Sequence, residues 1–244
     1  AMGQILAALG AMAPTMDLQQ TMDLSVNSGQ TLVLLRTHAN SYSSDPKAVA
    51  TSWIGAPQTC CTSVTSPTAC ASQAKASCFA GGHTFTIDPS GPAGSVLTGP
   101  ISGGKAVFGP GPATIKLPLS TSSALQLTLK AVHVKGTFSA GGAALSGGIL
   151  AGAISQTDLT TKVIPAIATM LDTMLKDPAV DKTTKDTIKT LFDTNKDGAI
   201  SASEVSNNML IKTFLAGDVD VDKDGVKELS LGVAFETATA TITP

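Results

Sequence analysis

The sequence predicts an α+β protein: a β-rich body, built as a sandwich or barrel, with a helical insertion before a C-terminal strand. Three observations favour this fold. Short apolar runs separated by glycine, proline and serine occupy residues 1–156. Apolar residues recur at helical spacing in residues 157–217. Alternation returns within residues 218–244, and because a lone strand is unstable in water, this strand must pair with the earlier ones. We therefore expect one integrated unit.

Composition excludes several classes of protein. The chain has 244 residues, of which 43% are hydrophobic, only 4% aromatic and 14% charged, a balance typical of exported β-rich proteins rather than cytosolic enzymes. The formal net charge of −2 provides no basic surface for nucleic acid or anionic lipid. No apolar run is long enough for a membrane helix.

The N-terminal region contains a short apolar stretch at residues 5–13. It lacks the positive flank of a signal peptide, so we expect a first packed segment there. An export signal or a lipid anchor would then belong to a longer precursor.

Four stretches of the body have the composition of strands, and one of them predicts a bulge. Alternate leucines from Leu125 to Leu129 share one face, and Val132 and Val134 continue that face after a slip of one residue. Because such a slip inverts the two faces of a strand, an extra residue near positions 130–131 is the simplest explanation. The four predicted strands are residues 31–36, 83–88, 113–119 and 124–139, followed by a glycine-rich stretch at 140–155 that suits turns and a closely packed strand.

All the cysteines of the chain lie in one short window, residues 60–78. An even number in so small a region predicts two disulfides and an oxidising compartment. Pairing between the adjacent Cys60 and Cys61 is disfavoured by geometry, and the other two connectivities remain open. A zinc site that uses His83 is the alternative, although the spacing does not match zinc modules. The four residues are Cys60, Cys61, Cys70 and Cys78.

Three helices are predicted in the insertion. The first begins near residue 157, with Thr157 or Asp158 as its cap, and Pro165 marks either a kink or the true start. Its apolar positions fall four residues apart, from Leu159 to Leu175. The other two are expected at residues 182–192 and 203–215.

A complete calcium-loop pattern separates the second and third of these helices. Oxygen-bearing side chains alternate from Asp193, Gly198 permits the sharp turn, and Glu204 stands where a bidentate carboxylate closes the site. The stretch 182–215 resembles an EF-hand. The predicted ligands are the side chains of Asp193, Asn195, Asp197, Ser201 (directly or through a water) and Glu204, and the carbonyl of Ala199.

A second acidic loop follows at residues 218–228. Alternating aspartates precede Gly225, but Leu231 stands where an EF-hand has its closing glutamate, and a strand pattern follows instead of a helix. This loop resembles the DxDxDG calcium loops of extracellular proteins. The predicted ligands are the side chains of Asp220, Asp222 and Asp224, the carbonyl of Val226, and a further carboxylate from either Glu228 or Asp218.

These features favour a calcium-binding, disulfide-stabilised protein that is secreted, periplasmic or on the outer surface. The whole chain is similar in general terms to secreted or lipid-anchored bacterial EF-hand proteins of unknown role. We expect two calcium ions that act as a structural staple, and a binding or structural role resembling that of an adhesin, with a cell-surface, glycan or protein ligand.

Two alternatives stay open. One is a secreted hydrolase or carbohydrate-active protein, although the histidines lie far apart and no nucleophile motif is present, so catalysis is uncertain. The other is a regulator switched by calcium, which would need an element that moves when the metal binds.

Overall fold

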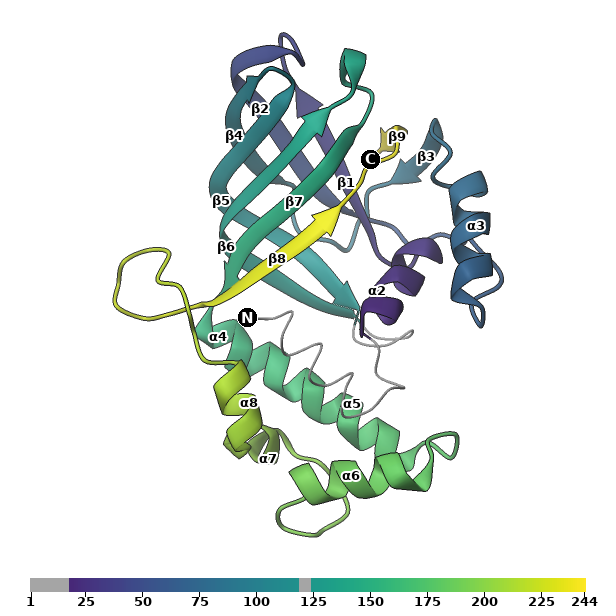
Figure 1. Ribbon diagram of the computed structural model, residues 1–244, viewed down its shortest axis with the longest axis vertical. Coiled ribbons are helices and arrows are strands. Elements are labelled where there is room, and N and C mark those ends of the chain that lie inside the picture. The colour runs from purple at the N-terminus through teal and green to yellow at the C-terminus, as the bar shows by residue number, and fades with distance from the viewer. Residues whose placement is uncertain (1–17, 119–123) are drawn as a thin grey trace.

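The computed structural model describes residues 18–118 and 124–244 (Figure 1). Within them, seven strands form one antiparallel sheet in the order β1-β2-β4-β5-β6-β7-β8, and this sheet curls into a half-barrel. The chain is thus a mixed α/β protein around one curled sheet, closer to the expected barrel than to the expected sandwich. The strands of this sheet are β1 (Leu32–His38), β2 (Ser44–Gly55), β4 (Ser95–Ser102), β5 (Lys105–Pro118), β6 (Ala124–Phe138), β7 (Leu145–Ile154) and β8 (Leu229–Phe235).

The C-terminal strand pairs with the body, as predicted. β8 runs antiparallel to β7 over its whole length, from Leu229 opposite Ile154 to Phe235 opposite Gly148. A further short strand, β9 (Ala240–Thr243), pairs in parallel with β3 (His83–Thr86) as a small second sheet. The predicted N-terminal segment, residues 5–13, lies outside the described residues.

The predicted bulge in β6 is confirmed. The pairing of β6 with β7 shifts between Lys130 and His133, its pairing with β5 shifts between Leu129 and Val132, and Ala131 has a positive φ of 47°. The extra residue keeps Leu129 and Val132 on the same buried face, where each is 0% exposed. The bulge also turns the Lys130 side chain toward the start of β8.

Helices occur in two groups (Figure 1). The first group adjoins the disulfide region, and the second lies beyond one end of the sheet, between β7 and β8 in the chain. The helices are α2 (Leu18–Asn27), α3 (Pro67–Ser77), α4 (Gln156–Asp158), a π-helical turn (Leu159–Val163), α5 (Ile164–Lys176), α6 (Lys182–Phe192), α7 (Ala202–Asn207) and α8 (Met209–Phe214), with a 3₁₀ turn at Ala140–Gly142.

The first helix of the insertion begins earlier than predicted. Its cap is Ser155, whose hydroxyl accepts the N–H of Asp158, rather than Thr157 or Asp158 itself. Pro165 falls in the first turn of α5, directly after the π-helical turn. Proline has no N–H to donate and disfavours a helical interior, so the widened turn lets the helix continue past it.

The second predicted helix matches α6, whereas the third is divided. Asn208 lies between α7 and α8 with an extended ψ of 127°, and its side-chain oxygen accepts the N–H groups of Leu210 and Ile211. An asparagine that caps a helix in this way starts a new one. The stretch 203–215 is therefore two short helices.

One continuous cluster of buried side chains joins the sheet to the helices of the insertion. Leu127 and Leu129 of β6, Leu171 of α5, Val205 of α7 and Leu229 of β8 all belong to it, and each is 0% exposed. Burial of apolar side chains is the main stabilising contribution to folding, so the helices are held against the end of the sheet by a shared core.

The cysteines form two disulfides, Cys60–Cys78 and Cys61–Cys70, which settles the connectivity that the sequence left open. Helix α3, which the sequence did not predict, carries Cys70 within this window. The zinc alternative is wrong, because all four thiols are used and His83 lies near Gln58 instead. Disulfides indicate an oxidising compartment.

The disulfide region has its own small core, in which Cys60 and Cys78 pack with Leu32, Leu34 and Phe85. Among the residues that the structure describes, no helix has the length and apolar character to cross a membrane.

Candidate metal-binding loops

The first loop, residues 193–204, connects α6 to α7. Asp193 is the residue at which α6 ends, and Ser201 caps α7. Between them Lys196 and Gly198 have positive φ values of 61° and 84°. Glycine reaches this left-handed region without steric cost, which is why the sharp reversal falls at Gly198.

Short-range hydrogen bonds hold the first loop in shape. Asp193 Oδ2 accepts the N–H of Gly198 at 3.0 Å, and Asp197 Oδ1 accepts the N–H of Ala199 at 2.9 Å. The side-chain amide of Asn195 donates to Asp197 Oδ2 at 2.9 Å. The side chains of Asp193, Asn195 and Asp197 therefore face the inside of the turn, as a calcium loop requires.

Glu204 closes the first loop. It is 6% exposed, and its carboxylate accepts the backbone N–H groups of Thr194 and Ser201, both at 2.9 Å, and the Ser201 hydroxyl at 2.8 Å. With the bond from Glu204 N–H to the Ser201 hydroxyl, this is a capping box. The Ser201 N–H and hydroxyl, with Asn195 and Thr194, lower the pKa of Glu204 to about 2.

The second loop, residues 218–228, repeats the turn of the first. Lys223 and Gly225 have positive φ values of 60° and 87°. Asp220 Oδ2 accepts the N–H of Gly225 at 3.1 Å, and Asp224 Oδ1 accepts the N–H of Val226 at 2.7 Å. Each of these features has its counterpart in the first loop, 27 positions earlier. The two loops are therefore local structural repeats, although a helix follows one and a strand follows the other.

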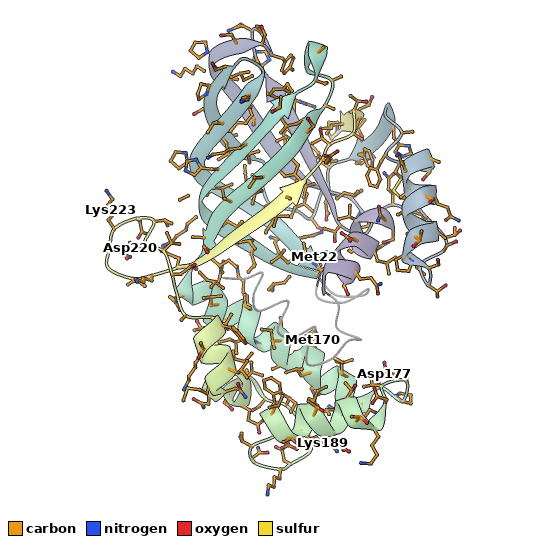
Figure 2. The ribbon with its side chains drawn as sticks, in the orientation of Figure 1. Met22, Met170, Asp177, Lys189, Asp220 and Lys223 are labelled. Atoms are coloured by element: carbon orange, nitrogen blue, oxygen red, sulfur yellow. A yellow bond between two sulfur atoms is a disulfide. The ribbon has the colours of Figure 1, made fainter. Side chains whose placement is uncertain are left out.

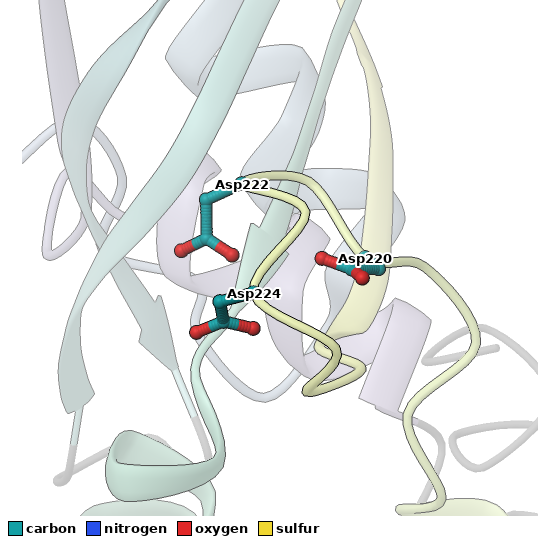
Figure 3. A group of neighbouring side chains, drawn as sticks. All are labelled: Asp220, Asp222 and Asp224. Carbon is teal, nitrogen blue, oxygen red and sulfur yellow. The ribbon is translucent and has the colours of Figure 1, made fainter.

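Three carboxylates converge in the second loop (Figure 3). Asp220, Asp222 and Asp224 each offer an oxygen within 4.8 Å of the others, and no other group of acidic, histidine or cysteine residues in the described ranges meets this criterion. Asp220 Oδ1 is buried without a hydrogen-bond partner. Figure 2 shows Asp220 and Lys223 on the loop that projects from the side of the molecule before β8.

The two residues considered for the closing carboxylate have different roles. Asp218 accepts the N–H and the hydroxyl of Ser230, both at 2.7 Å, so it ties the base of the loop to β8. Glu228 is buried and accepts the N–H of Val221 at 3.2 Å. Neither belongs to the group of three converging carboxylates.

Lys130 is the residue that sequence reasoning missed at this site. Its ammonium group donates to Asp222 Oδ2 and to Glu228 Oε1, each at 2.8 Å. Bonds from Lys130 lower the pKa of Asp222 and of Glu228, and the two carboxylates raise the pKa of Lys130, with Asp222 the larger cause. The bulge at Ala131 was the only sequence signal near this contact.

Of the two predicted ligand sets, the structure brings together the three aspartates of the second loop. Asp193, Asp197 and Glu204 do not converge, because Glu204 faces backbone N–H groups at the two ends of its loop. The donor atoms of both loops are oxygens, which suit a hard cation such as calcium or magnesium rather than a soft metal. No family model matches this chain, and comparison with curated proteins and with solved structures likewise gives no match.

Proposed function

We propose that this chain is a calcium-binding, disulfide-stabilised protein of an extracellular or periplasmic compartment, with a binding or structural role at the cell surface. Calcium acts as a structural staple at the two loops. The observation that carries the proposal is the convergence of Asp220, Asp222 and Asp224 in a loop that repeats the turn of the EF-hand pattern at 193–204.

The charge of the second loop supports a cation there. Three carboxylates with oxygens within 4.8 Å of one another repel strongly, and among the described ion pairs Lys130 offsets this repulsion at Asp222 alone. The buried Asp220 Oδ1 lacks the hydrogen-bond partner that buried oxygens ordinarily have. A calcium ion would satisfy both requirements, with Asp220, Asp222, Asp224 and the Val226 carbonyl as its ligands.

The fixed position of β8 favours a staple over a sensor. A sensor needs an exit element that swings when calcium binds. Here the second loop leads into β8, which is paired with β7 over seven residues and anchored at its start by Asp218 and Ser230. Binding to the folded chain alone would then add directly to its stability.

The disulfides support the compartment, because calcium is abundant where disulfides persist. The ligand of the β body is a cell-surface, glycan or protein partner in this proposal. The hydrolase alternative predicts turnover of glycan or ester substrates, and the regulator alternative predicts apolar surface that appears only with calcium.

The experiment is a calcium titration of the full chain after chelation, by calorimetry and by thermal unfolding, with Asp224→Asn as the loop variant and Asp186→Asn as the control. Asp186 is an exposed helix residue paired with Lys182, so its loss changes the net charge equally without touching a loop. The proposal is supported if calcium raises the thermal midpoint of the wild type and of Asp186→Asn, and raises the thermal midpoint of Asp224→Asn by a smaller amount. The proposal is refuted if calorimetry shows no heat of calcium binding and calcium leaves the thermal midpoint of the wild type unchanged.

A further inference from the structure

Lys130 is distant from the second loop in the sequence, but its ammonium group contacts two carboxylates there. Lys130 lies at the bulge of β6, and its ammonium group lies between Asp222 of the loop and Glu228 at the start of β8. The side chain of Glu228 is only 2% exposed, whereas those of Lys130 and Asp222 are 41% and 43% exposed. The bridge therefore has a buried end at Glu228 and an exposed end at Asp222.

The two ends differ in how easily they separate. A buried carboxylate without a partner is costly, so the bond between Lys130 and Glu228 is retained in the folded chain. An exposed ion pair contributes little, so the bond between Lys130 and Asp222 is the one that can open. Asp222 is thus free to turn toward a second cation while Lys130 stays in place.

A metal ion at the second loop would share Asp222 with Lys130. Calcium binds carboxylate oxygens at about 2.4 Å, and Lys130 Nζ already lies 2.8 Å from Asp222 Oδ2. Two positive charges on one carboxylate repel each other, and a divalent ion meets twice the repulsion that a monovalent ion meets.

We propose that Lys130 is a built-in counter-cation of the second loop, which holds the loop in shape without metal and weakens its affinity for calcium. This inference rests on the proposed calcium binding at the same loop. Lys130 determines the affinity of the site without being one of its ligands. The expected consequence is that removal of the charge makes calcium bind more tightly, although the metal-free protein becomes less stable.

The experiment is a calcium titration of the ¹⁵N-labelled full chain, followed through two backbone amides. Gly225 N–H donates to Asp220 and reports the second loop, whereas Gly198 N–H donates to Asp193 and reports the first. The variants are Lys130→Gln, which removes the charge and keeps a donor for Glu228, and Lys130→Arg, which keeps the charge. The first loop serves as an internal control in every sample.

In Lys130→Gln we expect Gly225 to saturate at about tenfold lower calcium than in the wild type, because a nearby positive charge has been removed. Gly198 should respond at unchanged calcium, and Lys130→Arg should resemble the wild type. Equal or weaker binding at Gly225 in Lys130→Gln overturns the inference but leaves the proposed function intact. If Gly225 fails to respond to calcium in the wild type, calcium binding at the second loop is itself refuted.

A second measurement keeps the inference testable if Lys130→Gln does not fold. The side-chain ¹⁵N signal of Lys130 in the wild type, assigned by its loss in Lys130→Arg, is followed during the same titration. We expect it to shift over the calcium range in which Gly225 responds, because Asp222 turns toward the metal. A signal that stays constant while Gly225 saturates overturns the inference.

Discussion

The carboxylate of Glu204 accepts a hydrogen bond from the backbone N–H of Thr194 at 2.9 Å, so the last residue of the first loop is tied to the residue that follows Asp193 at its start. The same carboxylate accepts the N–H of Ser201 and caps α7. Glu204 therefore organises the first loop before any cation binds.

Replacing Glu204 with glutamine is expected to lower the stability of the metal-free chain. Glutamine retains one accepting oxygen but loses the charge that strengthens these bonds, which corresponds to about 1 kcal/mol, or a fall in the thermal midpoint of roughly 2–4 °C. Thermal unfolding in excess chelator measures this, with Glu236→Gln, an exposed glutamate outside both loops, as control. Equal midpoints for the two variants would contradict the prediction.

Chelation is expected to lower the thermal midpoint of the wild type without a large change in the far-UV spectrum below the transition. The sheet and helices share a core to which the first loop contributes Ile200, while the rest of that core comes from strands, helices and their ends, so we expect secondary structure to persist when calcium is removed. A parallel assay with a dye for apolar surface tests the regulator alternative. Dye binding that rises with calcium would count against a staple.

Asp88, which lies outside both loops, is expected to make the free energy of unfolding depend on pH. The Ser90 hydroxyl, followed by Lys116 and the Ser90 N–H, lowers the pKa of Asp88 from 3.8 to about 2. Because the pKa is lower in the folded state, ionised Asp88 stabilises the chain fully above about pH 4, and this contribution is lost as the pH falls toward 2. The difference in unfolding free energy between wild type and Asp88→Asn should therefore shrink over that range. A difference independent of pH would exclude this origin.

Reduction of the disulfides is expected to loosen one region selectively. Loss of Cys60–Cys78 removes a constraint worth about 3 kcal/mol on the unfolded chain and opens the small core around Phe85. Hydrogen exchange after replacement of both cysteines by alanine should increase in α3, β3 and β9 and remain slow in β6 and β7. Uniformly faster exchange would mean that the two cores unfold together.

The bulge at Ala131 predicts a stabilising substitution. A non-glycine residue with φ of 47° is strained by about 1 kcal/mol or more, and glycine adopts this conformation freely. Ala131→Gly should therefore be neutral or stabilising by up to about 1 kcal/mol, and Ala131→Val clearly destabilising. Denaturant unfolding of the two variants decides this, and a marked loss of stability in Ala131→Gly would show that the strain is absent.

Sequence reasoning predicted the local features of this protein well. The bulge in β6, helix α6 and the presence of two disulfides follow from periodicity and spacing, which are properties of neighbouring residues. The pairing of the C-terminal strand was predicted differently, because a lone strand is unstable in water. Helix α3 was missed because its residues are mostly alanine, serine and polar groups, with no apolar periodicity to indicate a helix.

The candidate site was predictable only in part, because sequence patterns report on neighbouring residues and not on contacts between distant ones. The turn of each loop depends on a glycine and alternating oxygens, and both turns are present in the structure, but only the three aspartates of the second loop converge. The contact between Lys130 and Glu228 joins positions 98 apart, and no local pattern encodes it. The direction of the Glu204 carboxylate depends on free N–H groups at both ends of the loop, which only the folded backbone reveals.

The pairing of β3 with β9 has a consequence for the order of folding. Thr86 and Thr243 face each other across this pair, 157 positions apart, and Ile242 packs against the small core that contains Cys60 and Cys78. Contacts between such distant segments form slowly, because a long intervening chain must be ordered first. We therefore expect Ile242 to cover the cysteines late in folding, so that their thiols stay accessible to oxidants while the rest of the chain folds.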